Sequence, residues 1–90
     1  MVKRKRERLE IIRDILGSIK SSKKIRPTKL LSVSNLSPQM FKEYISELKR
    51  KGFLEEIYSK DKKYFILKEK GSKFLIEYGR VTNFIQNFGL

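Results

Sequence analysis

The sequence contains neither cysteine nor histidine. Without cysteine there is no disulfide and no thiolate metal site, which is compatible with a reducing cytosol. Without histidine, the chain also lacks the commonest general base and the second usual ligand of zinc. No glycine-rich phosphate loop is present, and the acidic residues show no metal-ligand spacing. We therefore expect no catalytic residues, no metal and no cofactor, and we do not expect an enzyme.

Long apolar runs are also missing, and none approaches the length of a membrane span. The basic amino terminus leads into a mixed helix rather than into the apolar core of a signal peptide. Such an arm suits nucleic acid or a membrane surface, but no apolar or lipidated anchor lies beside it. The residues of this arm are Lys3, Arg4, Lys5, Arg6 and Arg8. We expect a cytoplasmic protein with no membrane contact.

Acidic residues are scarce, with 10 Asp+Glu against 22 Lys+Arg, a net charge of +12 and a pI near 10.1. Such a field attracts polyanions without distinguishing among them. A lysine-rich surface often serves only to keep a protein solvated. Here the cations cluster at the amino terminus, around residues 23–29 and around residues 60–63, which favours binding of a polyanion. With 90 residues and 39% hydrophobic content, the chain forms one small packed domain. Association with a second copy would help such a small core.

Residues 3 to about 20 have the apolar spacing of an amphipathic helix. The polar segment 21–24 predicts a loop. Pro27 suits the first turn of a second helix, from about residue 27 to residue 33. The side chains expected to face inward are Leu9, Ile12, Ile15, Leu16 and Ile19 in the first helix and Leu30, Leu31 and Val33 in the second. A turn at residues 34–37 follows, in which Asn35 tolerates unusual backbone angles and Leu36 is an apolar plug.

The third helix has the clearest boundaries in the chain. Ser37 can cap its orphan N–H groups, Pro38 suits the first helical position, and Gly52 lies just past the last turn. Spacings of four and three place Phe41, Ile45 and Leu48 on the core face. The outward face then consists of Gln39, Lys42, Glu43, Ser46 and Arg50.

Residues 53–58 and 64–67 are β-rich runs that predict a hairpin, with the lysine-rich residues 59–63 as its loop. The aromatic side chains Tyr58, Tyr64 and Phe65 suit either a stacking platform for single strands or packing within the hairpin. We favour packing, because alternating aromatic residues in a hairpin usually serve that purpose.

From about Glu69 the pattern again predicts a helix. Its apolar residues are spaced by four, three, four and three, as in a coiled coil, at Phe74, Tyr78, Val81, Ile85 and Phe88. Residues 71–90 carry a net charge of only +1, which leaves +11 in the first seventy residues. This helix is therefore expected to meet protein rather than phosphate. We expect Phe74 and Leu75 to pack on their own domain; the alternative to a dimer seam is docking of the later residues on the first helix.

Three short motifs occur in a characteristic order: Asn35-Leu36-Ser37, Lys51-Gly52 and Glu69-Lys70-Gly71. In this order the chain resembles the archaeal winged-helix family that includes small chromatin-associated DNA-binding proteins and related transcriptional regulators. The resemblance implies an α+β winged helix-turn-helix of three helices and a two-stranded wing over residues 1–70. It also implies a homodimer paired through residues 71–90 as an antiparallel coiled coil, with Tyr78, Val81, Ile85 and Phe88 at the interface.

Two features depart from the family pattern. Lys68 stands where the family often has a capping threonine, and lysine cannot accept the orphan N–H bonds. The last helix also stops at Leu90, which makes its zipper shorter than that of some relatives.

The expected partner is double-stranded DNA, and the predicted contacts are of two kinds. Phosphate contacts are expected from cations and hydroxyls near helix starts and in the wing, namely Lys23, Lys24, Arg26, Thr28, Lys29, Ser37, Lys60, Lys62 and Lys63. The outward face of the third helix, with Gln39, Lys42, Glu43, Ser46 and Arg50, is expected to enter the major groove.

The expected function is that of a dimeric transcriptional regulator or a nucleoid-associated factor. A protein-interaction module is the alternative from another class, since winged-helix folds host both roles. RNA binding remains a lesser alternative, because attraction to phosphate does not distinguish the two nucleic acids.

Overall fold

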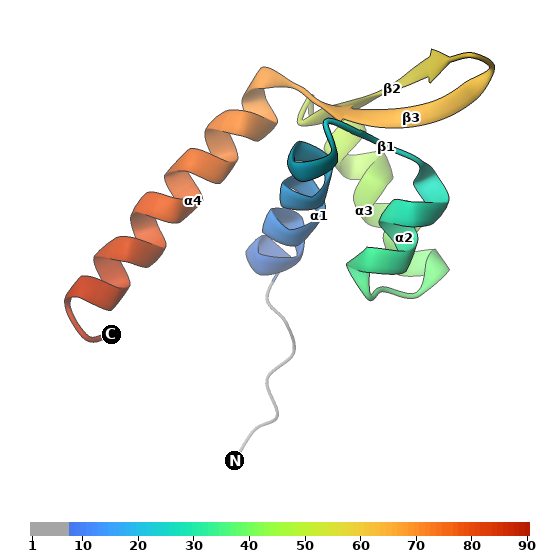
Figure 1. The fold of residues 1–90 in the computed structure, drawn as a ribbon. Helices are drawn as coiled ribbons and strands as arrows, with labels where there is room; N and C mark the ends of the chain where they lie inside the picture. The colour runs from blue at the N-terminus through green and yellow to red at the C-terminus, as the bar shows by residue number, and fades with distance from the viewer. Residues whose placement is uncertain (1–7) are drawn as a thin grey trace.

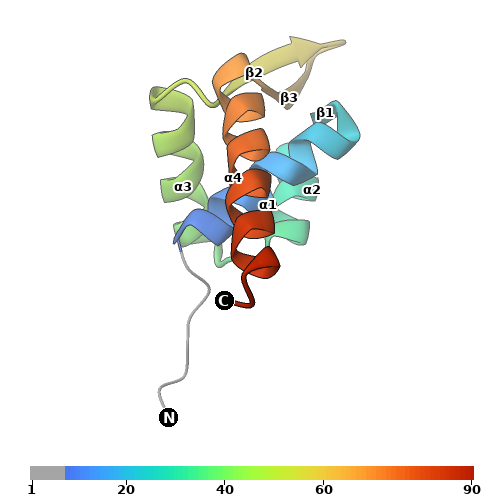
Figure 2. The ribbon, with the colours of Figure 1, turned by 90° about the vertical axis from the view of Figure 1, so that its left-hand side faces the viewer.

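The structure, a computed structural model, describes residues 8–90. Of the basic arm, Lys3, Arg4, Lys5 and Arg6 lie outside the described residues. The elements are α1 (Arg8–Ser22), β1 (Lys24–Ile25), α2 (Pro27–Ser34), α3 (Pro38–Arg50), β2 (Leu54–Ser59), β3 (Lys62–Leu67) and α4 (Glu69–Asn87). In Figure 1, α1 lies between α4 on one side and the α2–α3 pair on the other, and the β2–β3 hairpin projects beyond the helices. Turned by a quarter, the molecule presents α4 in front of α1 (Figure 2).

The sheet has three antiparallel strands in the order β1-β3-β2, which adds one strand to the predicted two-stranded wing. Lys24 and Ile25 pair with Ile66 and Phe65 of β3. A strand of two residues is too short to show alternation in sequence, and the loop predicted at residues 21–24 includes only its first residue, Lys24. The strand forms because tertiary packing brings it against the edge of β3.

The core lies between α1, α2, α3 and the inner face of the sheet, and its buried members include Ile15, Leu16, Leu30, Phe41, Ile45, Leu48, Leu54 and Phe65. Two predictions for α1 and α2 are wrong. Leu9 is 55% exposed and Val33 is 46% exposed, whereas Ile11 is buried. Because α1 packs against α4 as well as α2, its buried face shifts toward Ile11. In α2 the buried residues Leu30 and Ser34 are four apart and share the inner face.

The helix-turn-helix unit forms as the sequence predicts. Asn35 ends α2 in the left-handed conformation, with φ of 60°. The Ser37 hydroxyl accepts a hydrogen bond from the Met40 backbone N–H at 3.2 Å, and Pro38 opens α3. Gly52 follows α3 with φ of +84°, a conformation that glycine adopts without strain. These local devices fix where α3 begins and ends.

The hairpin turn is shorter than the predicted loop of residues 59–63. Ser59 pairs with Lys62, so the turn consists of Lys60 and Asp61 alone. Both have positive φ, 53° and 66°, as a type I′ turn requires to match the twist of the strands. Lys62 and Lys63 therefore belong to β3, and their side chains point to opposite faces of the sheet.

The base of α4 is held against the hairpin. Gly71 is buried, and the Phe53 and Phe74 rings meet edge to face with centroids 6.0 Å apart. Phe74 and Leu75 pack against the core, as expected. The Lys68 side chain makes no capping bond, again as expected.

Beyond its base, α4 diverges from the body of the molecule (Figure 1). Val81, Ile85 and Phe88 are 55%, 39% and 67% exposed, so the alternative in which they dock on α1 is not observed. None of the helices within residues 8–90 has both the length and the apolar character needed to cross a membrane.

Candidate nucleic-acid interface

The outward face of α3 is open to solvent over its whole length. With Phe41, Ile45 and Leu48 buried, the opposite residues are all exposed: Gln39, Lys42, Glu43, Ser46 and Arg50. The Gln39 side-chain amide donates to a Glu43 carboxylate oxygen at 3.1 Å. Two of the predicted base-contacting groups are therefore already joined to each other one helical turn apart.

A groove runs between α3, the start of α2 and the inner side of the hairpin. Its floor is apolar, formed by Phe41, Ile45 and Phe65 together with Pro27. Its rim carries Lys42, Ser46, Lys49, Lys63 and Glu56. The groove thus combines three lysines and one carboxylate above a hydrophobic base.

Lys49 and Glu56 were missed by sequence reasoning. Lys49 follows Ser46 and Lys42 at spacings of three and seven, a signal that would have placed it on the same side of α3. Glu56 gave no such signal, because its position depends on strand register. The Lys49 ammonium donates to Glu56 at 2.7 Å, and that of Lys63 does so at 3.4 Å. The hydrogen bond from Lys49, more than that from Lys63, holds the pKa of Glu56 below its usual range.

Lys24 and Arg26 gather over the Tyr64 ring on the other face of the sheet. The Lys24 ammonium lies 4.5 Å and the Arg26 guanidinium carbon 5.7 Å from the ring centroid. Cation–π contacts of this kind hold the two side chains near one another. The aromatic residues of the hairpin do not form a joint stacking platform, since Phe65 is buried and Tyr58 and Tyr64 point to opposite faces.

Most of the predicted site cations have no carboxylate partner within residues 8–90. The exception is Lys63, which contacts Glu56. The unpaired members are Lys23, Lys24, Arg26, Lys29, Lys42, Arg50, Lys60 and Lys62. Thr28 and Ser37 are exposed at the starts of α2 and α3. The structure brings Lys42 and Lys63 to one groove and Lys24 and Arg26 to the opposite sheet face, so the cations do not all share one flank.

A second acidic residue neutralises cations at the far end of α3. Glu47 accepts from Lys51 at 2.9 Å and also from the Arg8 guanidinium. These hydrogen bonds, first that from Lys51 and then that from Arg8, lower the pKa of Glu47. Arg8 also lies over the Tyr44 ring, with 5.6 Å to its centroid. This cluster joins the start of α1 to the end of α3 and is structural.

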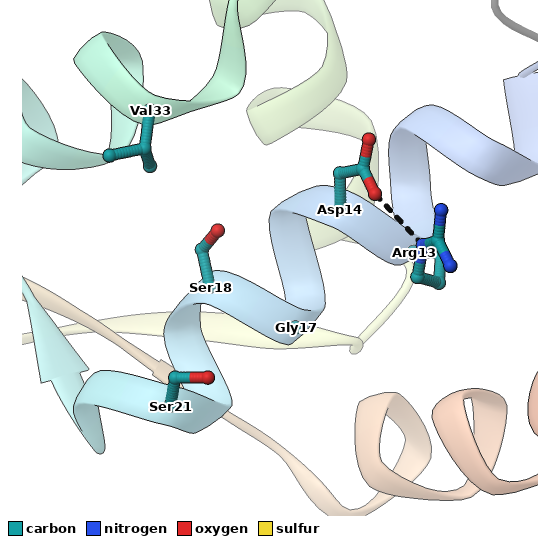
Figure 3. A pocket seen from close by; sticks show the side chains of 6 residues that line it. All are labelled: Arg13, Asp14, Gly17, Ser18, Ser21 and Val33. Atoms are coloured by element: carbon teal, nitrogen blue, oxygen red, sulfur yellow. Dashed lines mark hydrogen bonds and ion pairs between the residues drawn. The ribbon is translucent and has the colours of Figure 1, made fainter.

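A second hollow lies between the outer side of α1 and α2 (Figure 3) and is lined by Arg13, Asp14, Gly17, Ser18, Ser21 and Val33. Arg13 and Asp14 form an ion pair at 2.8 Å within it. None of the predicted site residues lies there. In the part of the chain that the structure describes, no group of acidic side chains is arranged to hold a metal ion.

Comparison with known proteins agrees with this architecture. A family model described as winged helix-turn-helix matches residues 5–86. A search of curated proteins found no match. Among solved structures, Sso10a-2, a DNA-binding protein from Sulfolobus solfataricus, is similar with a TM-score of 0.76 and 22% identity, over 92% of this chain and 85% of that one. The oxidized form of MarR from E. coli has a TM-score of 0.69 and 20% identity, over 76% of this chain and 50% of that one.

At these identities the two solved structures establish the fold alone, and the first of them comes from an archaeon, in line with the resemblance that the sequence motifs indicated. The match of the family model covers nearly the whole chain. The protein belongs to the winged helix-turn-helix family.

Proposed function

We propose that this protein binds duplex DNA as a homodimer, and acts without catalysis as a transcriptional regulator or nucleoid-associated factor in the cytoplasm. The observation that carries the proposal is the exposed outer face of α3, on which Lys42 and Arg50 have no carboxylate partner among the described residues. A helix with such a face, next to a projecting hairpin, is the arrangement with which helix-turn-helix proteins enter the major groove. The similarity to Sso10a-2, which is described as a DNA-binding protein, supports the same reading.

In this proposal, α3 supplies the contacts to base edges. Gln39 can pair with adenine, Lys42 with guanine, and Glu43 can accept from cytosine. The bond between Gln39 and Glu43 orients both groups before DNA arrives. Ser46 extends the same face toward the middle of the helix.

The phosphate contacts come from elements on either side of α3. Arg26, Thr28 and Lys29 lie at the start of α2, where partial positive charge from the helix adds to that of the side chains. Lys60 at the hairpin turn and Lys62 beside it contact the neighbouring DNA backbone in this proposal. These contacts add affinity and orientation without reading sequence.

The homodimer is proposed to form through α4. Its exposed apolar residues include the predicted Val81, Ile85 and Phe88, and also Phe84, whose ring centroid lies 4.8 Å from that of Phe88. Exposed apolar side chains this close together on one helix favour a protein partner over solvent. We divide the chain into a winged-helix domain of residues 1–70 and a dimerisation segment of residues 71–90, whose helix ends at Asn87 rather than at Leu90.

The first turns of that helix also belong to the core, through Phe74 and Leu75. Tyr78 stands at the border, since the Arg13 guanidinium lies over its ring at 5.2 Å. The dimer seam therefore begins at or after Tyr78.

The proposal is tested by titrating a labelled duplex with the protein across a salt series and following fluorescence anisotropy. We expect each winged-helix domain to neutralise about six to eight phosphates. The logarithm of the binding constant should then fall with the logarithm of the salt concentration, with a slope of about −0.9 per phosphate. Lys29→Ala should reduce the slope by about 0.9, because it removes one cation that the proposal assigns to a phosphate. Lys73→Ala is the matched control, since it removes the same charge from α4, where Lys73 is paired with Glu69.

Equal effects of the two variants would place the phosphate contacts away from the start of α2. Absence of binding to any duplex at low salt would refute the proposal. Replacing Gln39 by alanine should change the ranking of duplexes by affinity. An unchanged ranking would limit α3 to backbone contacts. An RNA duplex of the same length, added as competitor, should displace the labelled DNA poorly; if it displaced DNA equally well, the function would be general binding of nucleic acid.

A further inference from the structure

One acidic side chain lies inside the basic groove between α3 and the hairpin. Glu56 stands opposite Phe65 in the sheet register, so its carboxylate is on the side of the sheet that faces α3. A single carboxylate oxygen accepts from Lys49 of α3 at 2.7 Å and from Lys63 of β3 at 3.4 Å. The contact thus joins two elements that the proposed function places against DNA.

The same two ammonium groups suit an oxygen of a phosphate. Lysine is a compact point charge with three donors, and it binds carboxylate and phosphate oxygens alike. Lys42 and Ser46 stand on the same rim. A phosphate group in the position of the Glu56 carboxylate would therefore meet cations and a hydroxyl on several sides.

The exchange of one anion for another requires no opening of the core. The Lys49 and Lys63 side chains are 44% and 40% exposed, and that of Glu56 is 25% exposed. Exposed ion pairs contribute little net free energy, because water competes for both partners. The Lys49–Glu56–Lys63 cluster carries a net charge of +1, whereas the two lysines alone would present +2. The Lys49 hydrogen bond lowers the pKa of Glu56, so the carboxylate is ionised at neutral pH.

We propose that Glu56 competes with the DNA backbone for Lys49 and Lys63. In the free protein Glu56 binds both lysines, and on binding, a duplex phosphate replaces its carboxylate. The inference rests on the proposed function and adds a regulatory element to it. Its consequence is weak binding to polyanions in general, since two lysines beside α3 are withheld. A duplex that makes good contacts with α3 displaces Glu56 and so gains contacts with both lysines.

Glu55 provides a matched control one residue away. It faces the other side of the sheet, and its carboxylate lies 3.7 Å from the Lys68 ammonium. Glu55→Gln and Glu56→Gln change the net charge of the protein by the same amount. Any general effect of charge on affinity is therefore equal in the two variants, and only a local effect separates them.

The test measures binding of a labelled duplex to the full-length wild type and both variants across a salt series. Glu56→Gln should bind roughly three- to tenfold more tightly, because it releases two ion pairs that are each weak. On a duplex that makes poor contacts with α3, its salt dependence should steepen by about 0.9 for each lysine that contacts a phosphate in the variant and not in the wild type. Glu55→Gln should keep the wild-type slope. Equal affinity and slope in the two variants, or weaker binding by Glu56→Gln, would overturn the inference; weaker binding would mean that Glu56 positions the lysines instead.

A second readout separates this inference from the proposed function. If the wild type bound no duplex, the proposed function would fail, and elution from immobilised heparin would still report competition for a polyanion. Glu56→Gln should then elute at higher salt than Glu55→Gln, and co-elution would overturn the inference. Thermal unfolding of both variants, followed by circular dichroism, verifies that each is folded.

Discussion

Gly71 offers the sharpest test of how α4 is joined to the winged-helix domain. A Cβ at this position would lie 2.4 Å from the Phe53 carbonyl oxygen and 2.8 Å from a Leu67 methyl carbon. The carbonyl oxygen belongs to the backbone and accepts the Lys68 N–H at 3.0 Å. It cannot move away without loss of that bond, so Gly71→Ala must shift the base of the helix.

The magnitude follows from two opposing effects. Overpacking by one methyl group in a rigid site costs about 1–3 kcal/mol, and contact with backbone places this site at the upper end. Alanine is better than glycine in a helix interior by about 0.5–1 kcal/mol. We expect Gly71→Ala to lower the free energy of unfolding by about 2 kcal/mol, which for a domain of this size corresponds to roughly 10 °C in Tm.

Gly79 of the same helix is the control, because a Cβ there would have no neighbour within 4 Å. Gly79→Ala should raise the stability by about 0.5–1 kcal/mol, the propensity gain alone. Thermal and urea unfolding, followed by far-UV circular dichroism at one protein concentration, measures both variants. If Gly71→Ala unfolded at or above the wild-type temperature, the close approach of α4 to Phe53 would be refuted.

Three further predictions concern the dimer, the helix cap and acid stability. Replacing Val81 and Ile85 together by aspartate should yield monomers in sedimentation, because charge would then occupy the exposed apolar face of α4; persistent dimers would place the seam elsewhere. Ser37→Ala removes the cap of the Met40 N–H and should lower stability by about 1 kcal/mol in urea unfolding. No change in the urea midpoint would mean that water replaces the cap. Lys51 and Arg8 lower the pKa of Glu47 in the folded state, so its stabilising effect is present above the unfolded pKa of about 4.3 and is lost as pH falls through the folded pKa. Glu47→Gln should therefore show a smaller loss of stability in acid than the wild type, and parallel pH curves would contradict this.

Features that depend on neighbours along the chain could be predicted from the sequence. Ser37, Pro38 and Gly52 mark the ends of α3 because capping and backbone preferences act within a few residues. Asn35 marks the turn for the same reason. The spacing of Phe41, Ile45 and Leu48 assigned the inner face of α3, and with it the outward face of the candidate interface.

Features that depend on contacts between segments far apart in sequence could not be predicted in this way. Strand β1 exists because Lys24 and Ile25 meet the edge of β3. The choice of Ile11 over Leu9 for the core follows from the packing of α1 against two partners, which no single-helix pattern contains. The contact of Glu56 with Lys49 and Lys63 requires both the hairpin register and the approach of α3 to the sheet. The net charge follows from the composition. The fold determines which charged side chains form ion pairs, because pairing depends on distance in space.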